Sequence, residues 1–305
     1  MQPEPSHRGD MDLDQALNLV VAGLATGSIY ALLAMGYNVV FATTGILNFA
    51  QGELFMVGSL VGASLFVASG WPILAAVVIA VGLAAILGAV EEPLAVRPAT
   101  KRGHSAFGWV LSTFGFAIVL RSGAALIFGP DLRPFPPLFG RGQWNLGGVF
   151  INPTEVSLLV LTLLVAFALH SFYTRSLMGR ALAAIAQDPE AASFRGLPVG
   201  RLSIISFAIG SALAALAGFV AGPLTGTYPA IGLGFALKGF IAAAVGGIPE
   251  IKGALVGGLG LGLIEAFGAD IIGPGYRDAI VFAVLLIMLG VKPAGIFGRE
   301  SVRAV

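Results

Sequence analysis

Long stretches of apolar side chains constrain this chain more than any other feature of its sequence. An α-helix rises about 1.5 Å per residue, so a hydrocarbon core of about 30 Å requires about 20 apolar residues in succession. The clear runs are Leu13 to Gly36, Leu54 to Gly70, Pro72 to Val90, Ala106 to Phe128, Val156 to Leu169, Leu202 to Gly222, Ala254 to Ile272 and Ala279 to Val291. A ninth run, Phe235 to Ile248, is short and contains Lys238. The runs lack the alternation of a barrel strand, so they predict an all-α polytopic membrane protein.

Charged residues are scarce, and their scarcity excludes several classes of protein. Only 11% of the 305 residues are charged, whereas soluble domains carry roughly 25%. The net charge of +1 lacks the basic excess that nucleic-acid binding requires. The absence of cysteine excludes a disulfide framework and a cysteine-ligated metal. The 43 glycines, about twice the usual share of ~7%, favour closely packed or broken membrane helices.

Basic residues outside the apolar runs predict the orientation. Three groups of them follow the third run, the fifth run and the last run: Arg97, Lys101, Arg102 and His104; Arg175, Arg180, Arg195 and Arg201; Lys292, Arg299 and Arg303. The positive-inside rule places all three groups in the cytoplasm. Two cytoplasmic segments must be separated by an even number of crossings, so the short ninth run is counted as a crossing. We therefore expect about nine helices, or eight to ten if a segment is re-entrant, with the C-terminus in the cytoplasm.

The same pattern divides the chain into segments. Residues 1–12 are a polar N-terminal extension, which raises the question whether the chain starts at Met1 or Met11, and no signal peptide is recognised there. Residues 13–298 form the transmembrane domain and 299–305 a cytoplasmic tail. The external loop 129–153 is interpreted either as an ordered structure or as a simple connector.

Sequence signatures of catalysis are absent. The sequence contains neither G-x-x-x-x-G-K-[ST] nor H-E-x-x-H, and its three histidines lie far apart at positions 7, 104 and 170. We therefore expect that the chain is not an enzyme and that it binds no cofactor or metal.

A polar segment between two glycines interrupts the apolar pattern after the first run. It contains Asn48, Gln51 and Glu53, and it is typical of a broken helix whose backbone lines a cavity. The alternative is a helix cap, with Asn48 as the N-cap and Gln51 three residues later. We predict that these three side chains lie at or near a translocation path.

A second glycine-rich stretch, Gly222 to Gly234, is a candidate counterpart of this break. Aligning Thr44-Gly45 with Thr225-Gly226 also places Gly58 on Gly239, which suggests an internal repeat.

Three further charges lie within apolar runs: Arg121, Lys238 and Glu265. An ionisable group in hydrocarbon is costly, so each is a candidate functional residue. For Lys238 and Glu265 we favour an ion pair between helices, or snorkelling to an interface, over contact with a substrate.

The segment 175–201, here called the coupling loop, is predicted to form two short helices. Helix-forming residues fill Arg180 to Gln187, then Asp188 caps a second helix with Pro189 at its first position. Gly196 and Pro198 end that helix. Such an element suits docking to a partner protein, although an amphipathic helix on the membrane surface is the alternative.

Within the coupling loop, Glu190-Ala191-Ala192 followed by Gly196 resembles the E-A-A-x-x-x-G motif of permease subunits in ATP-binding cassette (ABC) importers. The rest of the chain resembles the LivH-type permeases of branched-chain amino-acid ABC transporters. The matching stretches are Gly27 to Leu32, Gly36-Tyr37, Gly45 to Glu53, Arg97-Pro98, Met178 to Ala181, Ala243 to Ile248, Gly253-Ala254 and Lys292 to Arg299.

The resemblance implies a subunit of the bacterial inner (plasma) membrane. Its partners would be two ATP-binding subunits, a second homologous permease, and a periplasmic or extracellular substrate-binding protein. ATP would bind to the partner subunits, so no cofactor is expected here. The residues implied in coupling are Arg180, Asp188, Glu190, Ala191, Ala192 and Gly196. The alternatives are a urea or amide permease of the same kind, or a self-sufficient secondary transporter.

Overall fold

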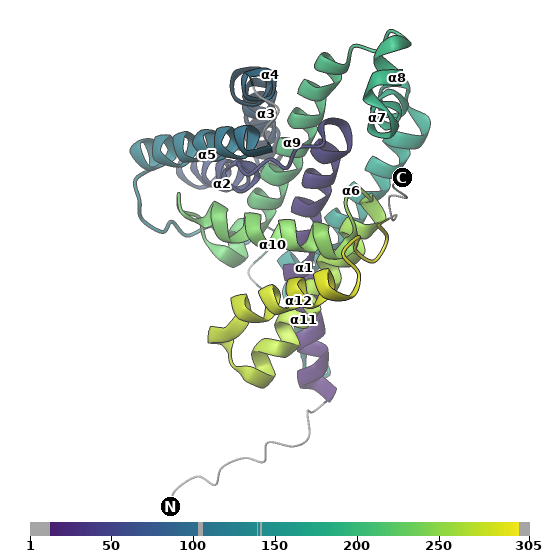
Figure 1. Cartoon of the computed structure of the whole chain (residues 1–305). Coiled ribbons are helices and arrows are strands. Elements are labelled where there is room, and N and C mark those ends of the chain that lie inside the picture. The colour runs from purple at the N-terminus through teal and green to yellow at the C-terminus, as the bar shows by residue number, and fades with distance from the viewer. Residues whose placement is uncertain (1–12, 103–105, 139, 141, 299–305) are drawn as a thin grey trace, which may run out of the picture.

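A computed structural model describes residues 13–102, 106–138, 140 and 142–298, and these residues fold mainly into helices (Figure 1). The α-helices are α1 (Leu13–Thr44), α2 (Gln51–Ala63), α3 (Ile73–Glu91), α4 (Arg97–Arg102), α5 (Ala106–Phe128), α6 (Pro153–Arg175), α7 (Leu177–Gln187), α8 (Pro189–Phe194), α9 (Val199–Thr225), α10 (Ile231–Gly246), α11 (Ile251–Ile272) and α12 (Arg277–Val291). A π-helical turn, Ser64–Ala68, prolongs α2, and another, Glu92–Val96, joins α3 to α4. A 3₁₀ turn, Pro274–Tyr276, precedes α12.

Eight helical segments within the described ranges are long and apolar enough to cross a membrane. They contain α1, α2, α3, α5, α6, α9, α11 and α12. The ninth apolar helix is α10, which has only 16 residues and corresponds to the short predicted run. The prediction of an all-α polytopic membrane protein is confirmed. The predicted polar N-terminal extension and C-terminal tail lie outside the described residues.

The centre of the bundle is formed by α1 and α9. Helix α1 packs against α6, α9, α10 and α11, whereas α9 also packs against α2 and α3. Every residue from Gly27 to Val40 is buried, which explains why this part of the sequence is apolar on every face. The peripheral helices α5, α6 and α12 instead expose large apolar side chains, such as Leu126, Leu164 and Leu286, as helices facing lipid or another apolar surface do.

Both predicted breaks are present, and each short helix begins inside the bundle. Helix α1 ends at Thr44, and Gly45 turns the chain with a φ of +67°, a conformation that favours glycine. The chain then returns, so that α2 begins with Gln51 beside Gly36. In the same way α9 ends at Thr225, Gly226 has a φ of +68°, and α10 begins close to α2.

The two breaks have equivalent surroundings. Gly58 of α2 lies against the backbone of Ala215 in α9, and Gly239 of α10 lies against Leu33 in α1. The sequence alignment that pairs Gly58 with Gly239 also pairs Ala34 with Ala215, and Ala34 is the neighbour of Leu33. These reciprocal contacts agree with the internal repeat suggested by the sequence.

The loop between α5 and α6 is ordered where the structure describes it. Strands β1 (Trp144–Leu146) and β2 (Val149–Ile151) form an antiparallel pair, a local departure from the all-helical prediction. The Asn18 side chain in α1 accepts a hydrogen bond from the Phe150 N–H at 2.8 Å, and Arg133 pairs with Thr227 through the backbone. This favours the ordered interpretation of the loop over a simple connector.

We predict that Gly58→Leu destabilises the protein, because even a Cβ at this position would overlap the Ala215 backbone. Overpacking of this kind costs about 1–3 kcal/mol, and thermal unfolding in detergent would show a lower midpoint. The matched control is Gly82→Leu on α3, where a Cβ would meet nothing within 4 Å. Equal midpoints for the two variants would contradict the assignment of Gly58 to a close helix contact.

Candidate functional site

The polar residues at the first break have different roles. Asn48 is fully buried; its Oδ1 accepts a hydrogen bond from the Ala50 N–H at 2.8 Å, and its Nδ2 donates to Glu91 at 2.8 Å. The alternative prediction of Asn48 as a helix N-cap is wrong, because Ala50 is the N-cap and Gln51 is the first residue of α2. Asn48 stabilises the turn that precedes the helix.

Gln51 also holds the break in place. Its Nε2 donates to the carbonyl of Gly210 in α9 at 2.9 Å, and the residue is fully buried. Asn48 and Gln51 therefore attach the break to α3 and α9, and of their side-chain polar atoms only Gln51 Oε1 has no hydrogen-bond partner among the described residues. Their predicted place at a translocation path stays a prediction.

Glu53 has a different environment from Asn48 and Gln51. It lies in the first turn of α2 and is 5% exposed, yet its Oε2 has no hydrogen-bond partner among the described residues. It lines a cavity of about 120 Å³ between α2, α5 and α10. The cavity is lined by Phe49, Gly52, Glu53, Phe114, Ala117, Ile118, Arg121, Leu233 and Ala236. We call it the break cavity.

The break cavity lies where α2 and α10 begin. The backbones of Gly52 and Gly232 are in contact there, so the first turns of both helices meet. Helix N-termini carry free N–H groups and a partial positive charge. The rings of Phe49 and Phe114 stack at 4.6 Å beside them, an aromatic wall that the sequence analysis missed because Phe114 comes from the distant α5.

The predicted ion pair between Lys238 and Glu265 is present. Lys238 Nζ lies 2.9 Å from Glu265 Oε1 and 3.0 Å from Asp278 Oδ1, and the Tyr30 hydroxyl donates to Glu265 Oε2 at 2.7 Å. The buried carboxylate of Glu265 therefore has partners on both oxygens, as stable burial requires. Tyr30 and Asp278, which come from α1 and α12, could not be assigned to this cluster from the sequence.

The coupling loop forms the two predicted helices, α7 and α8. Asp188 Oδ1 accepts a hydrogen bond from the Ala191 N–H at 2.9 Å and caps α8, which begins with Pro189. Gly196 follows the helix with a φ of +82°. Pro198 is the N-cap of α9.

The loop is folded onto the bundle on one side and open on the other. Leu182, Ile185, Ala192 and Leu202 form a small apolar core with side chains of α6 and α9. Of the predicted coupling residues, only Ala192 is buried, and the others are exposed: Arg180, Asp188, Glu190, Ala191 and Gly196. Figure 1 shows α7 and α8 together at one end of the molecule, apart from the main bundle. The coupling loop is therefore a projection that is packed firmly onto the bundle and exposed on its other side.

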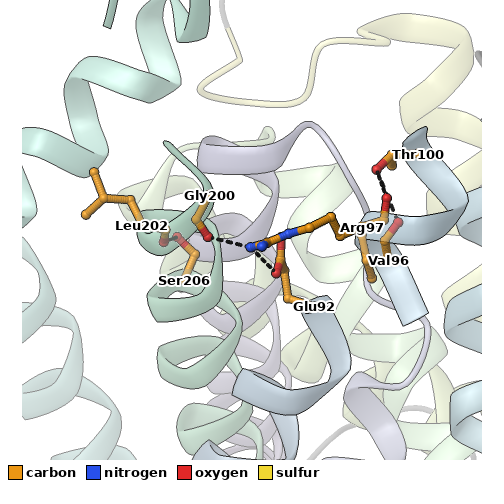
Figure 2. Close-up of polar contacts among 7 residues, drawn as sticks. All are labelled: Glu92, Val96, Arg97, Thr100, Gly200, Leu202 and Ser206. Carbon is orange, nitrogen blue, oxygen red and sulfur yellow. Dashed lines mark hydrogen bonds and ion pairs between the residues drawn. The ribbon is translucent and has the colours of Figure 1, made fainter. Parts of the chain in front are cut away.

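A polar joint, shown in Figure 2, connects the start of α9 with the π-helical turn between α3 and α4. Arg97 contacts both carboxylate oxygens of Glu92, at 2.7 and 3.2 Å, and also donates to the Gly200 carbonyl at 2.8 Å. Nearby, the Ser206 hydroxyl bonds to Leu202 and to the Thr43 hydroxyl of α1. A second cavity, of about 450 Å³, adjoins this Arg97 joint.

Sequence reasoning did not reveal the Arg97 joint. Glu92 and Arg97 are five residues apart, a spacing that a regular α-helix does not place on one face, and the π-helical turn between them brings the side chains together.

Comparisons with known proteins agree over most of the chain. Residues 19–289 match the family model described as branched-chain amino acid transport system / permease component. The high-affinity branched-chain amino acid transport system permease protein BraD of Pseudomonas aeruginosa is 36% identical over 95% of this chain and 98% of its own length. The corresponding protein LivH of Escherichia coli (strain K12) is 36% identical, covering 93% and 96%. The ribose import permease protein RbsC of Escherichia coli (strain K12) is 28% identical, covering 86% and 81%.

We predict that Arg97→Ala lowers the free energy of unfolding by about 1–3 kcal/mol, because it leaves the buried Glu92 carboxylate without its charged donor. Chemical denaturation of the purified protein measures this. Arg201→Ala is the control: it removes the same charge from the first turn of α9, and no described residue forms an ion pair with Arg201. Equal losses for both variants would refute a specific role for the Arg97 joint.

Proposed function

Because this chain belongs to the branched-chain amino acid transport system permease family, we propose that it forms the membrane passage of an ATP-driven importer of branched-chain amino acids. The observation that supports this most directly is the family match over residues 19–289, which spans the bundle, both breaks and the coupling loop. In this proposal the chain catalyses no reaction and binds no cofactor. The energy comes from ATP held by partner subunits.

The proposed docking site for an ATP-binding subunit is the exposed side of the coupling loop. A docking element must be stiff enough to transmit force, and the buried Leu182, Ile185 and Ala192 fix α7 and α8 against α6 and α9. It must also be accessible, and Glu190 and Gly196 are. We propose two ATP-binding subunits, one on this chain and one on a second, homologous permease.

Docking can drive transport only if ATP favours one conformation of the permease over another. The Arg97 joint includes Gly200 at the end of the coupling loop, and it ties the first turn of α9 to the π-helical turn that follows α3. A displacement of α8 would therefore move α9, whose inner part carries the contact with Gln51. We propose that this is how the loop controls the break between α1 and α2.

The orientation follows from the basic loops. The coupling loop and the C-terminus lie on the cytoplasmic side of a bacterial inner membrane, and the loop 129–153 lies outside. A substrate-binding protein would deliver the amino acid on that outer side. The hairpin β1–β2, which is attached to α1 through Asn18, offers it an ordered surface.

The nature of the cargo is proposed from the relatives, two of which are named for branched-chain amino acids. The similarity to a permease named for ribose shows that related chains are associated with chemically different solutes. Uptake of labelled leucine by the assembled transporter, with unlabelled valine and urea as competitors, tests the proposal. Competition by valine is expected; competition by urea instead would assign a different cargo.

We predict that Glu190→Lys reduces both the amount of ATP-binding subunit that co-purifies with the tagged chain and the rate of uptake by about tenfold or more. The substitution reverses a charge in the first turn of α8 without touching its buried side, because Glu190 is exposed. Truncating a charge at the centre of an interface commonly has an effect of this size.

The control for this experiment is Asp131→Lys, which makes the same change of charge on the exposed loop after α5. It should leave co-purification intact. Undiminished co-purification with Glu190→Lys would disprove docking through α8. Uptake that persists without the ATP-binding subunit and collapses with the proton or sodium gradient would favour a secondary transporter.

A further inference from the structure

The break cavity contains a buried acid, Glu53, one of whose oxygens has no hydrogen-bond partner among the described residues. Glu53 is only 5% exposed, and its Oε2 accepts no hydrogen bond from any described residue. Two other buried carboxylates have basic partners: Glu265 is bonded to Lys238 and Tyr30, and Glu92 to Arg97. Glu91 is bonded to Asn48 through one oxygen, and its Oε1 also has no partner among the described residues, but it does not line the break cavity. A buried carboxylate in an apolar bundle is costly when one oxygen lacks a hydrogen-bond donor, so Glu53 is a candidate functional residue.

A single cationic side chain, Arg121 of α5, lines the same cavity. Arg121 does not form an ion pair with Glu53 within 4 Å, and the described residues provide it with no other carboxylate at that distance. Because Glu53 and Arg121 line the same small cavity without forming an ion pair, a molecule that carries both charges can bind between them. The N-termini of α2 and α10 add further positive potential on the side where Gly52 and Gly232 meet.

The remaining walls are apolar. Phe49 and Phe114 stack against each other, and Ile118, Leu233 and Ala236 complete the lining. An aliphatic side chain can pack against such a wall, whereas a sugar would leave its hydroxyl groups without partners.

We propose that the break cavity is the site at which the permease holds its substrate during passage, and that it recognises an apolar amino acid in its zwitterionic form. The ammonium group of the amino acid pairs with Glu53. Its carboxylate faces Arg121 and the positive dipole ends of α2 and α10, and its side chain lies on the Phe49 and Phe114 rings. This inference rests on the proposed function and adds to it the residues that select the substrate.

The absence of cysteine from the chain permits a direct test in the assembled transporter. Ala117→Cys places a thiol in the wall of the cavity with a small change in volume. N-ethylmaleimide modification of this thiol is followed with L-leucine, with 4-methylpentanoate, which lacks the ammonium group, and with L-leucinamide, which lacks the carboxylate. Leu126→Cys, on the exposed side of the same helix, is the control.

We expect leucine to slow modification at Ala117→Cys about tenfold or more at saturation, and not at Leu126→Cys. The two analogues should protect much less at the same concentration. When Glu53→Gln is added to Ala117→Cys, leucine should protect the thiol no better than 4-methylpentanoate does. When Arg121→Gln is added instead, leucine should protect it no better than leucinamide does. Glu265→Gln, a buried acid outside the cavity, should preserve the preference for leucine.

Uptake of leucine by the transporter with Ala117→Cys distinguishes this inference from the proposed function. ATP-dependent uptake without protection by leucine overturns the cavity assignment and leaves the proposed function standing. Protection that is equal for leucine and 4-methylpentanoate, or that sodium ions alone produce, also overturns it. If neither the unaltered transporter nor any variant takes up an amino acid, both the cavity assignment and the proposed function are overturned.

Discussion

The architecture depends on the contact at which two helices begin inside the protein. The backbones of Gly52 and Gly232 touch there, and a Cβ on either residue would overlap the other. Such a start leaves N–H groups without intrahelical partners, which hydrocarbon cannot supply. The preceding segment supplies acceptors instead: Asn48 Oδ1 accepts from the Ala50 N–H, and the backbone carbonyls of Asn48 and Ala50 accept from the N–H groups of Gln51 and Glu53. The polar segment that interrupts the apolar pattern in the sequence therefore allows the two helix starts to meet.

Helix α9 connects this contact with the coupling loop. At its beginning it accepts a hydrogen bond from Arg97 through Gly200. Further along it is bonded to Thr43 through Ser206 and to Gln51 through Gly210. The loop and the start of α2 are thus attached to one rigid element. We propose α9 as the physical route for coupling, because a chain of packed and hydrogen-bonded groups can adopt two discrete arrangements.

The apolar runs predicted most of the fold, because a membrane helix must be apolar along its whole length. The caps at Asp188 and Gly196 were predictable for a similar reason, since local backbone requirements select particular residues. Long-range contacts were not predictable: the stacking of Phe114 on Phe49 joins α5 to the first break, and nothing in either segment indicates the other. The π-helical turn before Arg97 likewise departs from the regular period on which sequence reasoning depends.

We propose that the starts of α2 and α10 form a passage that the coupling loop controls. Spin labels on Ile118→Cys in α5 and Leu233→Cys in α10 would stand on the walls of the break cavity. Pulsed electron paramagnetic resonance in the assembled transporter then measures their separation with and without bound ATP. The account predicts a distribution of separations that changes when ATP binds. The same distribution in both states, in a transporter that continues to hydrolyse ATP and to take up substrate, would contradict it.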